Sequence, residues 1–331
     1  LAEKMDVAFE KLAMILKTID FKDTEHFSTV LKANISNRKQ NFVNSSLDYA
    51  FKRLNYKKSQ NAVLQEILWG FTGYENAVNM DTEKCGEYLK CFEKMYTQIK
   101  EGGAIVHYTT DKKTSEKLDA VVQKFVKDAE LLPLTAEKPR TKEELMAYVC
   151  QTSEEKNEYV NIDSQVGYAT MTFPCSKYVT REFMAEDLFT TWFSGHALWD
   201  KIRTVNGAYG ASMWLDAGIG QTDFYTYRDP RPDNSVKTVL EALEEVKKNG
   251  ITEEDVNDTI LSIFGQMTTP MVARDKGNNS FARTLFAQTN DQMEETISIL
   301  KTLTVEDVMA ALDRIIERIK ERNEMIVLQN N

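Results

Sequence analysis

The stretch LWDKIRTVNGAYGASMWLDAGIGQTDFYTYRDP, residues 198–230, decides the fold. Its first residues continue a helix, because apolar side chains recur at helical spacing from residue 184 onward. This apolar stripe consists of Met184, Leu188, Trp192, Trp199 and Ile202. Asn206 and Gly207 follow, and both residue types tolerate the left-handed conformation in which many helices end. The stretch therefore begins with a helix that stops in a tight turn.

The remainder of the stretch predicts an antiparallel hairpin. Side chains alternate between two faces along residues 208–214, as expected of a strand. Glycines within residues 216–220 predict a reversal of the chain. Residues 222–227 then predict a second strand, which is closed by Arg-Asp-Pro at 228–230. The whole unit is expected to be a helix, a tight turn and a hairpin.

Two separated motifs in this stretch carry a resemblance to a known family. The residues that match are Arg203, Gly207, Ala208, Tyr209, Gly210, Tyr227, Arg228, Asp229 and Pro230. The pattern is similar to that of the C-terminal domain of the insulinase/pitrilysin zinc peptidases, most closely their presequence-protease-like branch. Asn206 and Thr226 replace a glycine and a serine of that pattern. If position 206 requires a positive φ, asparagine is the least costly replacement, so we expect the turn to survive. The resemblance covers about residues 157–331 and is diffuse before them.

Composition excludes several classes of protein. The 331 residues suffice for two domains, and 42% hydrophobic and 28% charged residues are typical of a globular protein. A net charge of −10 argues against a nucleic-acid surface, and no apolar run reaches the length that spans a membrane. Four cysteines without a C-x-x-C pair favour a reducing compartment, which predicts a cytoplasmic protein. Cys85 lies on an apolar helix stripe and is expected to be a buried thiol. The chain opens without Met or a signal peptide, which suggests a piece of something longer.

The order of elements predicts an α+β fold in which an antiparallel sheet packs with helices, preceded by a mainly helical partial domain of the same type. In the first part we expect helices at residues 5–19, 24–54, 61–69, 82–101 and 115–126. Residues 104–109 read as a lone strand, whose partners would precede residue 1. A linker is expected at residues 131–144, where two prolines occur among charges. The resemblance implies four such domains per complete chain, so residues 1–137 would belong to the third and 138–331 would be the fourth.

The second part is expected to place its strands in meander order with helices between them. Strands are predicted at residues 158–163, 167–173, 208–214, 222–227 and 325–328. Helices are predicted at residues 180–203, with a possible interruption at Gly195, and at 233–249 and 291–300. Two more helices should begin at Thr252 with Asp255 and at Thr304 with Asp307, in patterns of the capping-box kind. Residues 269–280 are expected to form a loop, because they carry Pro, Gly and paired Asn residues.

The sequence of this chain contains no motif of a hydrolytic zinc site. The family that this chain resembles binds zinc through an H-x-x-E-H motif and a later glutamate. The three histidines, His26, His107 and His196, occur in no such motif and lie far apart in sequence. We expect His26 on a helix surface, His107 packed in its strand, and His196 as a satisfied core or boundary residue. The chain is therefore predicted to contain no catalytic residue and no metal ligand.

Arg203 and Tyr209 are the candidate substrate-binding residues. A purely structural interpretation is ordinary, since Arg203 suits the C-terminal end of a helix and Tyr209 suits a strand. The turn between them can nevertheless direct both side chains to one place. The resemblance implies that such a pair holds the substrate and the oxyanion of the tetrahedral intermediate, a role that suits both hydrogen-bond donors. Arg228 and Asp229 are expected to be structural, as a local ion pair and turn before Pro230.

The resemblance implies the C-terminal half of a zinc-dependent metalloendopeptidase that degrades unfolded peptides in a closed chamber between two halves. This half would supply chamber wall and the pair Arg203 and Tyr209. Zinc would be held by the missing N-terminal catalytic half of the same polypeptide, which would be the partner of this half, and peptides would be the substrates. Neither a nucleic acid nor a membrane is expected as a partner. One alternative is a non-catalytic scaffold or core subunit with the same fold, and a weaker one is an independent peptide-binding module.

Overall fold

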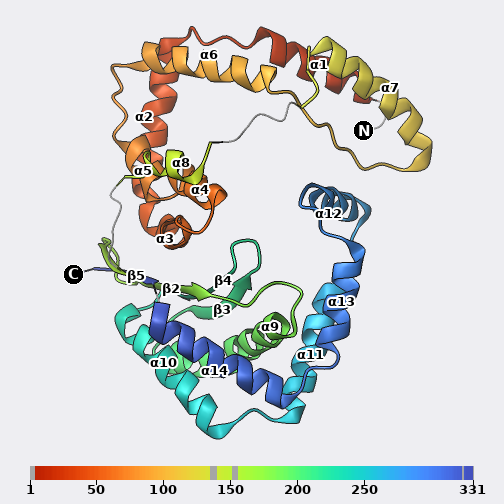
Figure 1. The fold of residues 1–331 in the computed structure, drawn as a ribbon. Coiled ribbons are helices and arrows are strands. Elements are labelled where there is room, and N and C mark those ends of the chain that lie inside the picture. Colours follow the sequence, from red (N-terminus) through yellow and green to blue (C-terminus); the bar gives the residue numbers. More distant parts are fainter. Residues whose placement is uncertain (1–3, 135–139, 151–155, 323, 331) are drawn as a thin grey trace. The chain divides into compact units, whose positions relative to one another are not determined.

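A computed structural model describes residues 4–134, 140–150, 156–322 and 324–330. The chain forms two compact units, each built from three separated segments (Figure 1). The helical unit comprises Leu1–Asn37, Asn79–Pro139 and Pro270–Thr289, and the sheet unit comprises Arg38–Val78, Arg140–Thr269 and Asn290–Asn331. The predicted domain boundary between residues 137 and 138 lies outside the described residues. The two compact units do not follow that division, because each of them takes segments from both sides of it.

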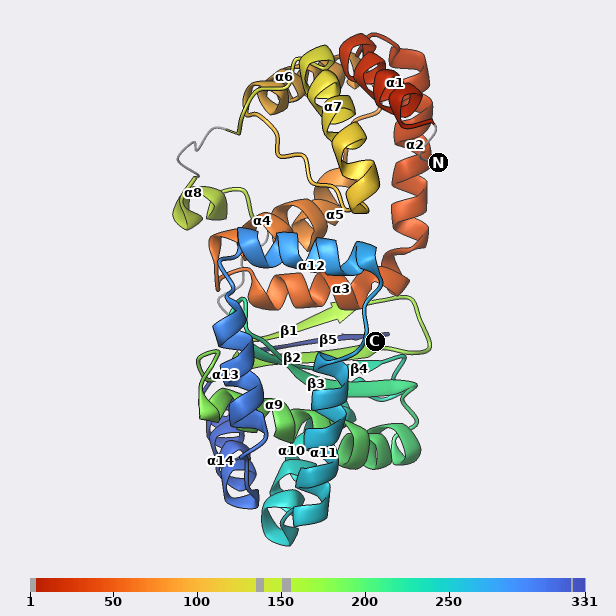
Figure 2. The same ribbon diagram turned by 90° about the vertical axis from the view of Figure 1, so that its right-hand side faces the viewer.

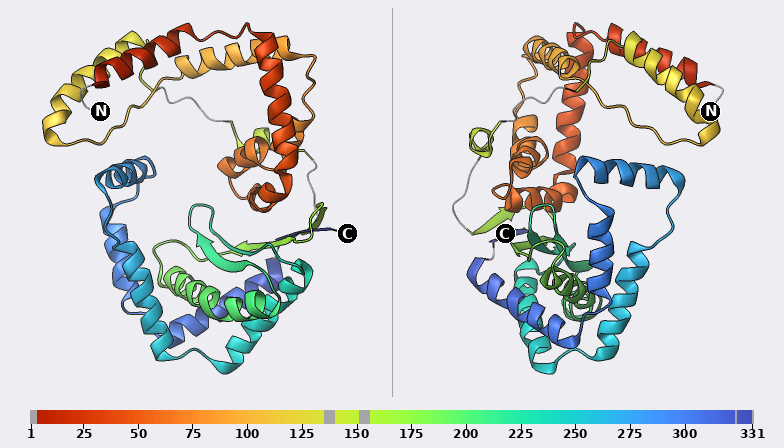
Figure 3. Two further views of the ribbon diagram at one scale, coloured as in Figure 1. Left: turned by 180° about the vertical axis from the view of Figure 1, so that it is seen from behind. Right: turned by 45° about the vertical axis from the view of Figure 1, so that its right-hand side comes forward.

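The helical unit contains no ladder of strands in its described part. Its helices are α1 (Met5–Thr18), most of α2 (Thr24–Gln40), α6 (Cys85–Glu101), α7 (Lys112–Asp128) and α12 (Ala273–Leu285). Helices α1 and α7 lie side by side (Figure 3), packed through Ala13, Phe125 and Ala129. The Phe9 and Phe125 rings are 5.2 Å apart. The helices predicted at residues 5–19, 82–101 and 115–126 are thus confirmed, with small shifts at their ends.

Two predictions in the helical unit are wrong. Residues 104–109 are not a strand, since they make one bridge, between Ala104 and Pro133, and no further pairing among the described residues. Residues 269–280 are not a loop, because helix α12 begins at Ala273. Gly277 allows this helix to approach residues 107–110 closely, since a Cβ at this position would lie 1.7 Å from Thr109 Oγ1. The glycine that suggested a loop is therefore a point of close packing.

The sheet unit consists of one sheet and the helices around it. Its helices are α3 (Phe42–Asn55), α4 (Gln60–Trp69), α5 (Phe71–Val78), α8 (Lys142–Met146), α9 (Arg181–Phe193), η2 (Ser194–Val205), α10 (Pro232–Asn249), α11 (Glu253–Met267), α13 (Asn290–Leu300) and α14 (Val305–Arg322). Its strands are β1 (Asn157–Asn161), β2 (Tyr168–Pro174), β3 (Gly210–Asp216), β4 (Gln221–Tyr227) and β5 (Glu324–Gln329). The single helix predicted at residues 24–54 is two helices, α2 and α3, which are separated at Asn41.

The sheet has the strand order β1-β5-β2-β4-β3. The predicted hairpin is confirmed, because β3 and β4 are antiparallel with Gly210 opposite Tyr227 and Asp216 opposite Gln221. The α+β class is also confirmed. The meander order is not, because the last strand, β5, enters between β1 and β2 and runs parallel to β1. Figures 1 and 2 show α9, α10 and α14 on one face of this sheet and α3 on the other.

Strand β2 shows why both faces of the sheet are covered. Its alternate residues Ala169, Met171 and Phe173 join the main core, together with side chains of α9, α10 and α14. Tyr168 points to the opposite face and packs in a second core. The other members of this second core include Tyr49, Ala50 and Leu54 of α3 and Ile326 and Leu328 of β5. Helix α3, although far away in sequence, is thus an integral layer of the sheet unit.

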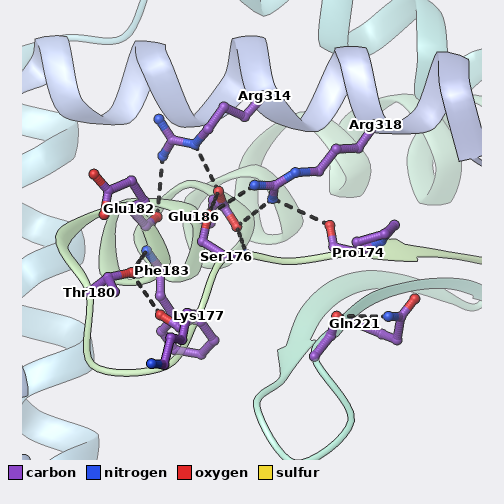
Figure 4. A network of polar contacts seen from close by, with 11 residues as sticks. Pro174, Ser176, Lys177, Thr180, Glu182, Phe183, Glu186, Gln221, Arg314 and Arg318 are labelled. Atoms are coloured by element: carbon purple, nitrogen blue, oxygen red, sulfur yellow. Dashed lines mark hydrogen bonds and ion pairs between the residues drawn. The ribbon is translucent and has the colours of Figure 1, made fainter. Parts of the chain in front are cut away.

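A buried carboxylate fixes helix α14 against the start of α9 (Figure 4). Glu186 is fully buried and accepts hydrogen bonds from Arg314 Nε and Arg318 Nη1, each over 2.9 Å. Its oxygens also accept from the backbone N and the hydroxyl of Ser176, at 2.8 and 2.6 Å. Two guanidinium groups and a loop therefore surround one carboxylate, an arrangement in which a buried charge is both paired and hydrogen-bonded.

The predicted helix starts in the sheet unit are confirmed by their caps. The Thr252 hydroxyl accepts from the backbone N of Asp255 while the Asp255 carboxylate accepts from the backbone N of Thr252, a reciprocal capping box. Thr304 and Asp307 make the same pair of contacts at the start of α14. Helix α10 ends at Asn249, and Gly250 follows as its C-cap, with a φ of 79° that favours glycine.

Candidate functional site

The helix that leads to Arg203 changes its winding before it reaches that residue. The helix predicted at residues 180–203 is α9 up to Phe193 and the π-helix η2 from Ser194 to Val205. A π-helix winds more loosely than an α-helix, which changes the phase of its faces. Leu198 and Ile202 are consequently fully buried, whereas Trp199 is 48% exposed. The inclusion of Trp199 in the apolar stripe was therefore wrong.

The turn after η2 requires its positive φ at Gly207 and not at Asn206. Gly207 has a φ of 86°, while Asn206 stays helical at −81°. Asn206 is buried, and its side chain donates to Thr238 Oγ1 over 3.0 Å and accepts from Asn234 Nδ2 over 3.2 Å. Its backbone oxygen accepts from Arg231 Nη2 over 3.1 Å. Asparagine at this position thus ties the end of η2 to helix α10, a role that glycine could not fill.

The turn brings Arg203 and Tyr209 together, as the sequence predicts. The Arg203 guanidinium carbon lies 5.5 Å from the centre of the Tyr209 ring and 4.0 Å from that of Trp199. Tyr209 is 65% exposed and is held by Tyr227, whose ring it meets edge-on at 6.0 Å and whose carbonyl oxygen accepts from its backbone N over 3.0 Å. Within the described residues, no carboxylate or other acceptor binds the Arg203 guanidinium. Its donors are thus available to a ligand.

These residues line a cleft with a volume of about 840 Å³. Its lining comes from η2, β3, β4 and α3, and consists of Leu47, Phe51, Trp199, Arg203, Tyr209, Gly210, Ala211, Ser212, Trp214, Tyr225 and Tyr227. Arg203 is the charged residue of this described lining, and most of the others are aromatic or apolar. Such a cleft suits a ligand that combines apolar groups with a hydrogen-bond acceptor.

Helix α3 supplies a wall of the cleft that sequence reasoning missed. Phe51 lies 5.2 Å from the Trp214 ring and 6.2 Å from the Tyr225 ring, and those two rings are 5.4 Å apart. All three contacts are edge-to-face, and all three side chains are only partly buried. We name these three residues the aromatic cluster. Phe51 is separated from the hairpin by more than a hundred residues, so no local pattern indicated it.

A smaller pocket of about 310 Å³ shares Phe51 and Trp214 with the cleft. Asp223 of β4 lines it and is 4% exposed. Burial, and to a smaller extent the nearby Asp216 charge, raises the pKa of Asp223 to about 6, against the hydrogen bonds from Thr172 and Asn55 and the charge of Lys58, which lower it. The carboxyl group beside the aromatic cluster therefore titrates closer to neutrality than an ordinary aspartate.

The remaining candidate residues contribute no chemistry to the cleft. His26 is exposed on α2, and His107 stacks on Phe281 at 4.4 Å in the helical unit and not in a strand. His196 is exposed, but its Nδ1 lies 2.8 Å from the Trp192 carbonyl oxygen. Across the described ranges, no three His, Cys, Asp or Glu side chains are grouped so that they could hold a metal. The described residues therefore do not fit a zinc site.

The predicted ion pair between Arg228 and Asp229 is wrong. Arg228 adopts a φ of 48° and places its guanidinium 5.6 Å from the Tyr227 ring centre. The Asp229 carboxylate instead accepts from the backbone N of Arg231 over 2.8 Å, and its backbone pairs with Gly167. The two residues are structural, as expected, but through a turn and a sheet bridge.

The cysteines and the helices give two further findings. Cys85 is buried, as predicted, and Cys85, Cys91, Cys150 and Cys175 are all free thiols. Burial raises the pKa of the Cys175 thiol to about 11, which keeps it protonated. Among the helices in the described part of the chain, none is both long and apolar enough to cross a bilayer.

Comparison with known proteins identifies relatives of this chain. Residues 157–330 match the family model described as "PreP C-terminal domain". An uncharacterised protein of Borreliella burgdorferi is 22% identical over 99% of this chain, and the mitochondrial presequence protease of Candida albicans is 22% identical over 85% of it. These alignments cover 33% and 28% of the two relatives, so the chain spans about a third of their length.

Solved structures share the fold. A conserved protein from Enterococcus faecalis V583 has a TM-score of 0.62 at 13% identity, over 99% of this chain and 74% of that one. A protease from Helicobacter pylori has a TM-score of 0.57 at 15% identity, over 98% of this chain and 77% of that one. At these identities the likeness concerns the fold alone.

Proposed function

The chain belongs to the family of PreP C-terminal domains, and from this membership we propose that it is the C-terminal part of a zinc-dependent peptidase that degrades unfolded peptides. In this proposal the chain binds substrate in the cleft and forms part of the wall of a chamber. Its partner is the N-terminal catalytic half of the same polypeptide. The zinc belongs to that half, since the described residues here do not fit a metal site.

The observation that supports this proposal most directly is the environment of the Arg203 guanidinium. Its guanidinium faces a cleft, is flanked by two aromatic rings, and has no acceptor among the described residues. A guanidinium without a carboxylate partner is suited to hold an oxygen of a ligand. Next to it, the Tyr209 hydroxyl offers a second donor that needs no charge. Together they would donate hydrogen bonds to a peptide carbonyl oxygen and to the oxyanion that develops from it.

The aromatic cluster supports a peptide as the occupant of the cleft. Phe51, Trp214 and Tyr225 present partly exposed rings beside the hydrogen-bonding pair. An apolar or aromatic side chain of a peptide would bury its surface there, while its main chain meets Arg203 and Tyr209. The cysteines, all free thiols, agree with a reducing compartment. The mitochondrial names of several relatives belong to those proteins, and a cytoplasmic location stays a prediction.

The test uses the full-length protein. Arg203→Ala and Tyr209→Phe should each lower turnover of an unfolded peptide by roughly 10²–10³-fold, the usual effect of removing an oxyanion donor. The melting temperature should barely move, because neither side chain fills the core. Tyr159→Phe on β1 and Arg274→Ala on α12 are matched controls, since both residues are exposed and lie outside the cleft. If both cleft variants keep near-normal turnover, or lose it only by unfolding, Arg203 and Tyr209 are structural and do not bind substrate. If the full-length parent itself shows no turnover, the non-catalytic scaffold becomes the better interpretation.

A further inference from the structure

We propose that Trp199 is a positioning residue for Arg203: its ring holds the guanidinium by one face, so that the in-plane N–H donors point to the substrate. This inference rests on the proposed function, because it assigns a role to the neighbour of a substrate-binding residue. It adds a residue that does not itself donate to the substrate. The group that Arg203 receives would be a carbonyl or carboxylate oxygen of a peptide.

The first support is the exposure of Trp199. A tryptophan that is 48% exposed leaves much apolar surface in water, while its neighbours Leu198 and Ile202 fill the core completely. The winding of η2 places Trp199 on the side of the cleft together with Arg203, four residues later. Core packing therefore does not account for this tryptophan, whereas contact with Arg203 does.

The second support is the geometry of the contact. The guanidinium carbon lies 4.0 Å from the Trp199 ring centre, well inside the range of a cation–π interaction. The Tyr209 ring is a second aromatic neighbour at 5.5 Å. An aromatic ring interacts with the face of a guanidinium, whereas its N–H donors lie in the plane. The ring can therefore restrict the side chain without occupying any donor.

The third support is the contrast with other arginines of the sheet unit. Arg314 and Arg318 are bonded to the Glu186 carboxylate, and Arg181 to the Asp307 carboxylate. Each of these side chains uses its donors for a structural ion pair. Arg203 has no such pair among the described residues, so it is held by rings alone. Because Trp199 already restricts the rotamers of Arg203 in the free protein, less conformational entropy of this side chain is lost when substrate binds.

The experiment is a double-mutant cycle in the full-length protein. Trp199→Leu keeps an apolar side chain but removes the ring, and should lower kcat/KM roughly tenfold, the order expected of a partly desolvated cation–π contact. Trp199→Phe should recover most of this loss, because it restores a ring. In the Arg203→Ala background, Trp199→Leu should have no further effect. Trp69→Leu on α4 is the control, as an equally exposed tryptophan outside the cleft.

The outcomes separate this inference from the proposed function. Arg203→Ala alone tests the proposed function, and if that variant is fully active both proposals fall. If Arg203→Ala is impaired while Trp199→Leu is not, only the positioning role is refuted. Additive losses in the cycle would refute it as well, because Trp199 would then act independently of Arg203. The melting temperatures of all variants show whether a loss of activity comes from misfolding. If Trp199→Leu is unstable, Trp199→Phe gives a second measurement.

Discussion

Asn55 on α3 donates a hydrogen bond from its Nδ2 to the carboxylate of Asp223 on β4 over 3.3 Å. The same side chain accepts from Thr172 Oγ1 on β2 over 3.2 Å. One buried amide thus joins the helix that walls the cleft to two strands of the sheet. This contact lies one turn after Phe51 on α3 and, together with the core residues Tyr49, Ala50 and Leu54, attaches the helix to the sheet.

The raised pKa of Asp223 predicts a pH-dependent contribution to stability. The folded chain keeps this proton up to about pH 6, whereas the unfolded chain releases it near about pH 4. The unfolded state therefore binds fewer protons in this window, and the free energy of unfolding falls as pH rises through it. Asp223→Asn should remove this fall, gaining up to about 3 kcal/mol relative to the parent between pH 4 and pH 7. Urea unfolding across this range measures the difference, and parallel curves for the two proteins would contradict it.

Phe51→Ala should change the substrate preference of the full-length protein. The aromatic cluster would lose one ring, and with it roughly 1–2 kcal/mol of contact to a bulky apolar side chain of the peptide. We expect kcat/KM to fall about tenfold for a peptide with an aromatic residue at the responsive position, and to change little for its alanine counterpart. Phe286→Ala is the control, because Phe286 is exposed and is not part of the cleft lining. Equal losses on both peptides would argue against a side-chain subsite.

Glu186→Ala should be strongly destabilising. The substitution leaves two guanidinium groups and the Ser176 loop without their shared acceptor, and breaking a buried ion pair in this way costs roughly 3–5 kcal/mol. Glu182→Ala is a suitable comparison, because Glu182 is exposed on the same helix. Chemical denaturation of the chain measures both. A loss below about 1 kcal/mol for Glu186→Ala would mean that the network is replaceable.

The chain by itself should bind no stoichiometric zinc and hydrolyse no peptide. The physical reason is the lack of a suitable donor group among the described residues. Metal analysis of the purified chain after dialysis, with the full-length protein as the positive comparison, measures this directly. One tightly held zinc per chain would defeat the prediction.

Sequence reasoning succeeded where the signal was local. Thr252 and Thr304 each predict the start of a helix together with an aspartate three positions later. The hairpin is predicted by side chains that alternate between two faces on either side of a loop with glycines. It failed where a distant segment decides the structure. Residues 104–109 have the composition of a strand but make a single bridge among the described residues, and α12 continues through Gly277, which lies against Thr109.

The candidate site shows the same division. Arg203 and Tyr209 could be paired from the turn between them, which lies within a single stretch of sequence. Phe51 could not, because α3 reaches the hairpin only in three dimensions. Trp199 was assigned to the apolar stripe because an α-helical period was assumed. Gly195 indicated an interruption close to the start of η2, but not that the helix continues with π-helical winding.

The position of β5 has a consequence for synthesis. Strand β5 lies between β1 and β2 in the sheet, yet about 150 residues separate the end of β2 from the start of β5. At ordinary elongation rates, residues 324–329 leave the ribosome on the order of ten seconds after β2 does. During that interval β1 has no neighbour, and β2 has at most β4, so the sheet is complete only when its last-made strand is inserted. The nascent chain therefore exposes unpaired strand edges until residues 324–329 have been made.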